Sequence, residues 1–142
     1  MKTIKEGFLR KNLGLGKEEL IRRWLDKYCY INGKYTINKD LIIDVDGGVD
    51  LIKYEEKQLP DYIQFRKVTK YFYINNCPKL ESLEGCPEEV GWDFSCSGCS
   101  KLTSLEGCPK KVGWDFYCYN CGKQFTENDV EKYCKVTGKI NG

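Results

Sequence analysis

Apolar residues near the start of the chain recur at the spacing of a helix. The segment GKEELIRRWLDKYCY, which begins at Gly16, gathers one apolar stripe of Leu20, Ile21, Trp24, Leu25 and Tyr28. Residues three and four positions apart share one side of an α-helix. The pattern therefore predicts a helix that begins near Gly16 and ends near Asn32-Gly33.

The next positions alternate between apolar and polar residues, which is the pattern of a strand. KYTINKDLIIDVDGGV, from Lys34 to Val49, predicts one or two strands with turns at Asn32-Gly33 and Gly47-Gly48. Gly48 to Val68 is expected to form an irregular first coil of the array described next, with Leu51 standing where later coils have phenylalanine.

From Val68 onward the apolar positions repeat every twenty-two residues. Segments that begin at Val68, Val90 and Val112 can be placed in register, and the match extends beyond the valines. A repeat of this kind is typical of a solenoid, in which each coil buries its apolar face against the next. The other matched columns are Phe72, Phe94 and Phe116; Ile74, Cys96 and Cys118; Cys77, Cys99 and Cys121; and the pairs Leu80 with Leu102, Leu83 with Leu105 and Cys86 with Cys108.

Each coil is predicted to hold one short strand followed by an irregular return. Phe94 and Cys96 are separated by one residue, so both face the same side of a strand. Gly107 and Pro109 fall in the return, where turns are expected. After Phe125 the repeat breaks down. Thr126 and Asp129 then have the spacing of a capping box, and a short helix follows whose apolar face is predicted to be Val130, Tyr133 and Cys134.

The repeat resembles the leucine-rich-repeat family. The string F-x-C-x-x-C-x-x-L-T-S-L, from Phe94 to Leu105, is similar to the family core L-x-L-x-x-N/C-x-x-L. The resemblance covers residues 45–125 and implies parallel strands that line a concave face. It also implies that Cys77, Cys99 and Cys121 bond to backbone between coils. The chain departs from the family pattern in two ways. It has phenylalanine in place of the first leucine, and its period is longer than the period of about twenty residues in the shortest class of these repeats.

The expected fold class is therefore α+β: a short leucine-rich-repeat-like solenoid with a small parallel sheet, capped by an N-terminal and a C-terminal helix. Within this single domain, residues 1–44 are predicted to form the helical cap and a lead-in strand. Residues 45–125 form the solenoid of three to four coils, and residues 126–142 form the C-terminal capping helix and tail.

The cysteines allow two interpretations. Cys96, Cys99, Cys118 and Cys121 form two Cys-x-x-Cys pairs separated by eighteen residues, a spacing typical of a four-thiolate zinc site. That separation also follows from the repeat period, and the first coil has Ile74 where the second has Cys96. Isoleucine cannot bind zinc, whereas a free cysteine packs as a small apolar residue. We interpret the thiols as interior packing without a cofactor, and keep the zinc site as the alternative.

Composition narrows the classes of function. The 142 residues include no histidine, which is the commonest general base and triad partner. No phosphate loop, dinucleotide fingerprint or hydrolase elbow is present, and we expect a protein that is not an enzyme. No apolar run reaches the ~18 residues that span a membrane, and the N-terminus lacks an apolar secretory stretch. A cytoplasmic location is therefore expected.

The outward positions of the stacked strands are the candidate binding surface. Tyrosine and tryptophan dominate binding hot spots, so a face rich in both predicts a protein partner. The alternative for the tryptophans is that they pack beneath the terminal helices. The candidate residues are Trp92, Trp114, Tyr71, Tyr73, Asp93, Asp115, Tyr117 and Tyr119.

Charge offers a different partner. The net charge is +2, but residues 1–34 hold nine Lys and Arg against four Asp and Glu. The basic residues Lys17, Arg22, Arg23 and Lys27 of the predicted helix make nucleic acid the alternative partner.

The resemblance described above extends to repeat proteins encoded by bacteria and their phages. It implies an inhibitor of a bacterial enzyme or defence complex that acts by occlusion in the host cytoplasm.

Overall fold

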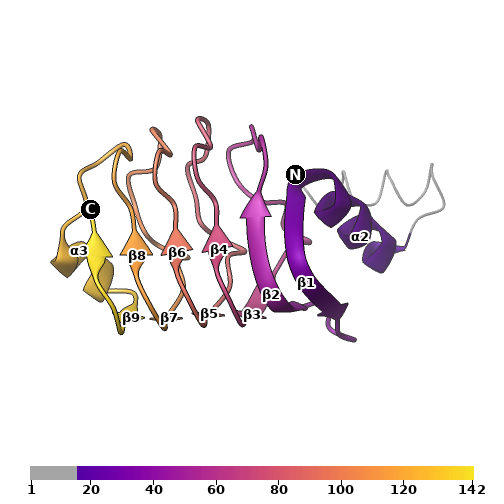
Figure 1. Cartoon of the computed structure of the whole chain (residues 1–142). Coiled ribbons are helices and arrows are strands. Elements are labelled where there is room, and N and C mark those ends of the chain that lie inside the picture. The colour runs from indigo at the N-terminus through magenta and orange to yellow at the C-terminus, as the bar shows by residue number, and fades with distance from the viewer. Residues whose placement is uncertain (1–15) are drawn as a thin grey trace.

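In the computed structural model, which describes residues 16–142, the chain winds into a parallel β-solenoid of about four turns with few helices (Figure 1). The first fifteen residues of the predicted N-terminal unit lie outside the described residues. No helix within the described range combines the length and the apolarity needed to cross a membrane. The elements are α2 (Lys17–Tyr28), β1 (Cys29–Ile37), β2 (Ile43–Leu51), β3 (Phe65–Val68), β4 (Phe72–Tyr73), β5 (Glu89–Val90), β6 (Phe94–Ser95), β7 (Lys111–Val112), β8 (Phe116–Tyr117), α3 (Glu127–Glu131), β9 (Lys135–Val136) and β10 (Ile140–Asn141).

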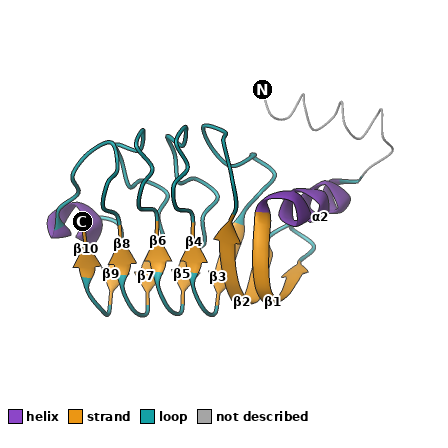
Figure 2. Ribbon diagram, turned by 45° about the horizontal axis from the view of Figure 1, so that its top comes forward, coloured by secondary structure: helices purple, strands orange, loops and turns teal. Residues whose placement is uncertain are grey.

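The coils stack in the register that the repeat predicts. β5 pairs in parallel with β7 at Val90 and Val112, and β6 pairs in parallel with β8 at Phe94 and Phe116. Both ladders therefore advance by the repeat period, which is confirmed. The prediction of one strand per coil is wrong, because each coil after the first has two short strands joined by a corner (Figure 2).

Glycines at the corner allow neighbouring coils to approach closely. A Cβ added to Gly91 would lie 2.1 Å from the carbonyl oxygen of Thr69. The chain turns between the two strands, so Val90 and Phe94 both enter the core while Trp92, midway between them, stays outside it. One straight strand would have placed all three on the same face, since side chains alternate with a period of two. The corner therefore creates the second strand and directs the tryptophan outward.

The two ladders and the return segments enclose one apolar core. The rings of Phe72, Phe94 and Phe116 are fully buried, with centroids 6.1 Å and 5.1 Å apart along the ladder. The thiol of Cys99 donates a hydrogen bond to the carbonyl of Ile74 at 3.1 Å, one coil earlier. Cys121 does the same to the carbonyl of Cys96 at 3.2 Å. These thiols therefore fill the interior and bridge adjacent coils.

The helix near the N-terminus has the predicted start, and it buries most of the predicted apolar face. α2 begins after Gly16 at its N-cap and buries Leu20, Ile21, Trp24 and Leu25. Its end differs from the prediction, because β1 starts at Cys29 and runs straight through Asn32-Gly33.

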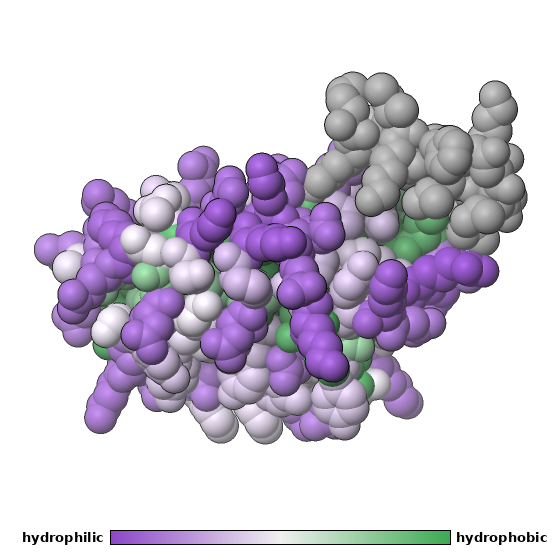
Figure 3. Space-filling model, turned by 90° about the horizontal axis from the view of Figure 1, so that it is seen from above, coloured by the Kyte–Doolittle hydropathy of each residue, from purple (hydrophilic) through white to green (hydrophobic). Residues whose placement is uncertain are grey.

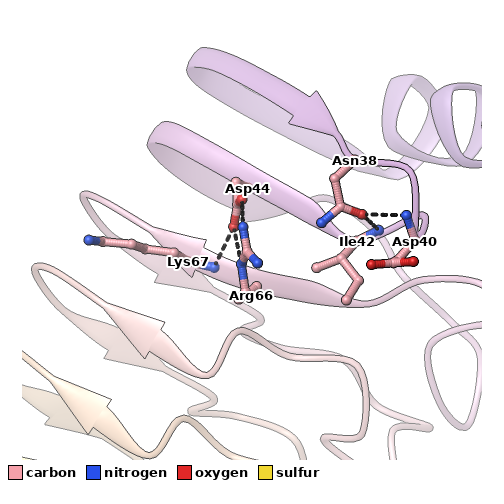
Figure 4. Close-up of polar contacts among 6 residues, drawn as sticks. All are labelled: Asn38, Asp40, Ile42, Asp44, Arg66 and Lys67. Carbon is pink, nitrogen blue, oxygen red and sulfur yellow. Dashed lines mark hydrogen bonds and ion pairs between the residues drawn. The ribbon is translucent and has the colours of Figure 1, made fainter.

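Asn32-Gly33 and Gly47-Gly48 both prove to lie within strands and not in turns. Gly33 lies opposite Gly47 in the antiparallel pair of β1 and β2. A Cβ added to Gly33 would lie 2.2 Å from the carbonyl oxygen of Asp46, so glycine is required for close approach of the strands. The turn itself follows β1, where Asn38 Oδ1 accepts hydrogen bonds from the backbone N–H groups of Asp40 and Ile42 at 2.8 Å and 3.1 Å (Figure 4).

β2 opens the solenoid and serves both ladders. Its first part pairs with β3 and its last part pairs with β4. Val49 lies beside Phe72, so Val49 and not Leu51 takes the place of phenylalanine in the irregular first coil. The predicted register is thus wrong by two residues. Leu51 is nevertheless only 4% exposed, because a shift of two keeps a side chain on the same face.

The C-terminal segment confirms the predicted capping box. Thr126 Oγ1 accepts from the N–H of Asp129 at 3.2 Å, and Asp129 Oδ2 accepts from the N–H of Thr126 at 2.8 Å. Val130 and Cys134 are buried as expected. Tyr133 is 41% exposed and does not belong to the apolar face, because α3 ends before it.

A last coil follows α3 and was not predicted. β9 pairs with β7 and β10 pairs with β8, so the described chain finishes with both ladders extended once more. Val112 lies beside Val136, a step of twenty-four residues in place of twenty-two. The inserted α3 hides this coil from an alignment that requires a constant period.

Candidate functional site: an aromatic corner and a tyrosine face

Two tryptophans stack at the corner of the solenoid. The indoles of Trp92 and Trp114 have centroids 4.7 Å apart and planes only 1° apart. The Nζ of Lys70, one coil earlier, lies 5.3 Å from the centroid of Trp92. Trp114 is 51% exposed, so the alternative that both tryptophans pack beneath a terminal helix is wrong for Trp114. We call Lys70, Trp92 and Trp114 the aromatic corner.

Tyrosines occupy the outward side of the ladder that continues from this corner. Tyr71 and Tyr73 stack in one coil with centroids 4.6 Å apart. Tyr117 and Tyr119 meet edge to face two coils later, with centroids 6.5 Å apart. We call these four residues the tyrosine face. The exposed Tyr119 and the partly buried members together offer hydroxyl groups and ring surface on one side of the molecule.

A polar network under the tyrosine face fixes its coils relative to one another. Ser95 and Ser97, in the coil between the tyrosine pairs, are each 5% exposed. Asn75 Oδ1 accepts from the Ser95 hydroxyl at 2.5 Å and from the Ser97 N–H at 3.0 Å. Ser97 Oγ in turn accepts from the N–H of Tyr119 at 3.2 Å. These bonds join three successive coils, so the surface above them is held by satisfied polar groups.

Two aspartates lie beside the aromatic corner and also join coils. Asp93 Oδ1 accepts from the N–H of Asp115 at 2.9 Å, and Asp115 Oδ1 accepts from the N–H of Lys139 at 2.8 Å. Desolvation and then the charge of the nearest aspartate raise the pKa of Tyr73 and of Tyr117. Burial disfavours the phenolate whatever the sign of the nearby charge, and the carboxylate of Asp93 or Asp115 disfavours it further. These two carboxylates place negative charge beside the tyrosine face.

All eight residues singled out from the sequence lie together in the structure. The repeat register places Lys70 in one outward column with the two tryptophans, and it places Asn75, Ser95 and Ser97 in the outward columns that hold the tyrosines. The prediction that Ser95 and Ser97 face outward is wrong, because each is only 5% exposed and bonds to Asn75 of the preceding coil. The eight residues are Trp92 and Trp114 of the aromatic corner, Asp93 and Asp115 beside it, and Tyr71, Tyr73, Tyr117 and Tyr119 of the tyrosine face.

The view from above shows a face of different character. Hydrophilic side chains cover most of it, and hydrophobic ones show only in the gaps between them (Figure 3). The apolar residues of the return segments, such as Leu83 and Leu105, are buried.

A charged trough beside the corner was not predicted. It has a volume of about 850 Å³ and crosses β1, β2, β3, β5 and β7. Its lining alternates in charge from strand to strand, and Thr69, which also lines it, precedes Lys70 of the aromatic corner. The successive bands are Asp44 and Asp46, Arg66 and Lys67, Glu88 and Glu89, and Lys110 and Lys111.

The bands of the trough neutralise one another. Arg66 Nε donates to Asp44 Oδ1 at 3.1 Å, and the N–H of Lys67 donates to the same oxygen at 3.2 Å (Figure 4). The hydrogen bond from Arg66 is the largest of the effects that lower the pKa of Asp44. Because each band of charged residues lies next to a band of opposite charge, the trough has little net charge. The charged dipeptides Arg66-Lys67, Glu88-Glu89 and Lys110-Lys111 recur at the repeat period, so the alternation of charge is visible in the sequence.

The basic residues of α2 are partly engaged with acidic neighbours. Arg22 lies 3.4 Å from Glu18, and Arg23 lies 3.5 Å from Glu19, each as a pair one helical turn apart. The Nζ of Lys27 lies 5.2 Å from the centroid of Tyr28. Such pairs reduce the positive potential that a phosphate backbone would meet.

The cysteines of the alternative zinc site are divided between stacked coils. Within residues 16–142, no three or more His, Cys, Asp or Glu side chains are grouped so as to hold a metal ion. Cys96, Cys99 and Cys118 are buried, and Cys121 is partly exposed. A hydrogen bond from Cys96 lowers the pKa of Cys121 to about 7. A hydrogen bond from Cys77 also lowers the pKa of Cys99, but Cys99 is buried, so Cys121 is the more accessible of these two thiols.

Comparison with known proteins gives no relative. No protein-family model matches the chain, and neither do curated proteins or solved structures. The geometry of the corner and of the tyrosine face is therefore the basis for any functional assignment.

Proposed function

We propose that the protein is a non-enzymatic recognition module that binds a protein partner through the aromatic corner and the tyrosine face. The observation that carries the proposal is the parallel stack of Trp92 and Trp114 with Trp114 half exposed. The fold does not require an indole there, because the interior columns beneath it are complete without it. A large ring held rigidly at a surface loses little conformational entropy when it is covered.

Two features of the surroundings support this assignment. The polar network of Asn75, Ser95 and Ser97 holds the coils of the tyrosine face in place, which limits reorganisation on binding. Asp93 and Asp115 add charge at the margin of the rings, the arrangement of an apolar centre with a polar rim. A nucleic-acid partner is less well supported, since these carboxylates would repel phosphates.

The narrower parts of the assignment rest on the sequence alone. In this proposal the array is of the leucine-rich-repeat-like type, and α2 and α3 serve as caps at its two ends. The module acts in the cytoplasm of a bacterial host, where it inhibits an enzyme or a defence complex by occlusion. This last part follows from the resemblance to repeat proteins of bacteria and phages.

The experiment compares three tagged proteins in affinity capture from a bacterial lysate. The wild type is compared with the Trp92→Ala/Trp114→Ala double variant and with Tyr133→Ala. Tyr133 is an exposed ring next to the return segments and so controls for the loss of any exposed aromatic residue. We expect a partner that is recovered by the wild type and by Tyr133→Ala and is lost with the double variant.

The captured partner is then purified and its dissociation constant measured at two salt concentrations. Trp114→Ala should weaken binding about 30-fold, the equivalent of about 2 kcal/mol at a hot spot. Salt should have little effect, whereas binding to phosphates would weaken steeply with salt. Equal recovery by all three proteins, or a steep loss with salt, would show that this surface is not the binding site.

A further inference from the structure

The column of side chains at the aromatic corner is open at one end. In the last coil the residue beside Trp114 is Gly138, whose N–H donates to the carbonyl of Trp114 at 2.7 Å. The N–H of Trp114 donates to Trp92 in the same way at 3.2 Å. Glycine has no side chain, so one face of the Trp114 indole has Trp92 against it and the other has no neighbour from the column.

The opposite end of the same column is closed by a cation. Lys70 places its Nζ 5.3 Å from the centroid of Trp92, on the side away from Trp114 in the order of the coils. An ammonium or guanidinium group over an indole face is attracted by the negative potential of the ring. Along the coils, the column therefore consists of the Lys70 ammonium group, the two stacked indoles and then a vacant position. A second cation fits this vacant position.

The charges around the vacant position favour a cation as well. Asp93 and Asp115 follow the two tryptophans in the sequence, and a Cβ added to Gly138 would lie 2.2 Å from Asp115 Oδ1, so this carboxylate borders the vacant position. The backbone N–H of Lys139 bonds to Asp115, so an exposed lysine follows Gly138 and its positive charge opposes an incoming cation. The effect of the negative charge of the aspartates and that of the positive charge of Lys139 can each be tested by substitution.

We propose that an arginine side chain of the protein partner stacks its guanidinium group on the open face of Trp114. Arginine fits better than lysine, because the planar guanidinium covers a flat ring and keeps its N–H groups free for the neighbouring carboxylates. This inference rests on the proposed function and adds the chemistry of the partner at the centre of the surface.

The test titrates small probes and does not require the partner. The protein is labelled with 5-fluorotryptophan, and its three tryptophan signals are assigned by fluorine NMR with single Trp→Phe variants. The probes are N-acetyl-arginine amide, the neutral isostere N-acetyl-citrulline amide, and adenosine monophosphate. We expect arginine to shift the Trp114 signal most and to leave the signal of the buried Trp24 unchanged. Citrulline should bind about two- to fivefold more weakly, the equivalent of an exposed cation–π contact.

Two charge variants give opposite expectations. Asp93→Asn keeps an oxygen acceptor for Asp115 and removes one negative charge, so arginine should bind about two- to fivefold more weakly. Lys139→Gln removes the opposing ammonium group and should strengthen arginine binding by a similar factor. The proposal is overturned if citrulline binds as well as arginine, if adenosine monophosphate binds more tightly, or if the Trp114 signal does not respond selectively.

The two proposals can fail independently. If the probes fail while partner capture still depends on the tryptophans, the surface binds a protein but not through arginine at Trp114. If arginine binds and no partner depends on the tryptophans, the site has the proposed chemistry and the recognition function is wrong.

Discussion

Replacing Gly113 by alanine tests how closely the coils approach at the corner. The new Cβ would lie 2.1 Å from the carbonyl oxygen of Gly91 and must withdraw by about 1.3 Å to reach the 3.4 Å of an ordinary contact. Two hydrogen bonds cross the coils here, from the N–H of Gly113 to Val90 at 2.9 Å and from that of Trp114 to Trp92 at 3.2 Å. A separation of that size takes both beyond bonding distance.

The expected loss of stability follows from these two bonds. A hydrogen bond lost at a partly buried site costs about 1–2 kcal/mol, because donor and acceptor are left without a full replacement. Alanine also restricts the unfolded chain, which offsets about 0.4–1 kcal/mol. We therefore expect the free energy of unfolding to fall by about 1–3.5 kcal/mol, a large part of the ~5–15 kcal/mol of an ordinary domain.

Urea unfolding followed by far-ultraviolet circular dichroism measures this change. The near-ultraviolet spectrum should change as well, because the parallel indoles at 4.7 Å lose their stacking. Gly16→Ala is the matched control: no atom lies within 4 Å of its added Cβ, and the loss should stay under ~1 kcal/mol as a change of N-cap. A Gly113→Ala protein within ~0.5 kcal/mol of the wild type would refute the close approach.

Three further predictions concern charge, thiols and metal. Arg66 lowers the pKa of Asp44, so the ionised carboxylate stabilises the fold above its ordinary pKa and the effect is lost as pH falls through the lower folded value. Urea titrations should therefore show Asp44→Asn less stable than the wild type at neutral pH and equal to it in acid; a difference independent of pH contradicts this. Iodoacetamide at pH 7 should modify Cys121, with its pKa of about 7, before Cys29, whose pKa burial raises to about 12, as peptide mass spectrometry can measure. The reverse order would contradict the assignment. A chelator should leave the melting temperature unchanged; stoichiometric zinc together with unfolding on chelation would restore the zinc interpretation.

The interior of the solenoid could be predicted because it repeats. Val90 with Val112 and Phe94 with Phe116 are paired in the structure as they are in the sequence alignment. Each column must present a similar apolar shape to the next coil, so sequence identity at a fixed interval reports spatial contact directly. The same reasoning identified the capping box at Thr126, which depends only on residues three positions apart.

The errors arose where a short signal has more than one structural cause. Gly33 was read as a turn residue, but it is needed because Asp46 approaches closely across the strand pair. Gly91 and Gly113 are likewise needed because neighbouring coils approach closely there. The corner that they form cannot be recognised from the alternation of apolar and polar residues. The last coil was missed because α3 lengthens the step to Val136.

The candidate site was predictable in its members and not in its contacts. Trp92 and Trp114 were placed in one column by the repeat, which implies that they are neighbours. Their parallel stacking and the exposure of Trp114 depend on the corner, which the sequence analysis did not find. The trough shows in the sequence only as charged dipeptides that recur by coil, because the alternating bands cancel in the net charge of a long segment.

The uniform register of the two ladders also means that one coil can be exchanged for its neighbour. A chain without residues 90–111 would bring Val112 beside Val68, Phe116 beside Phe72 and Cys121 beside Cys77, so that every interior column stays continuous. Duplication of the same twenty-two residues would lengthen the molecule and add a third indole to the stack. The length of the recognition surface is therefore a variable that evolution can change by whole units, without redesign of the core.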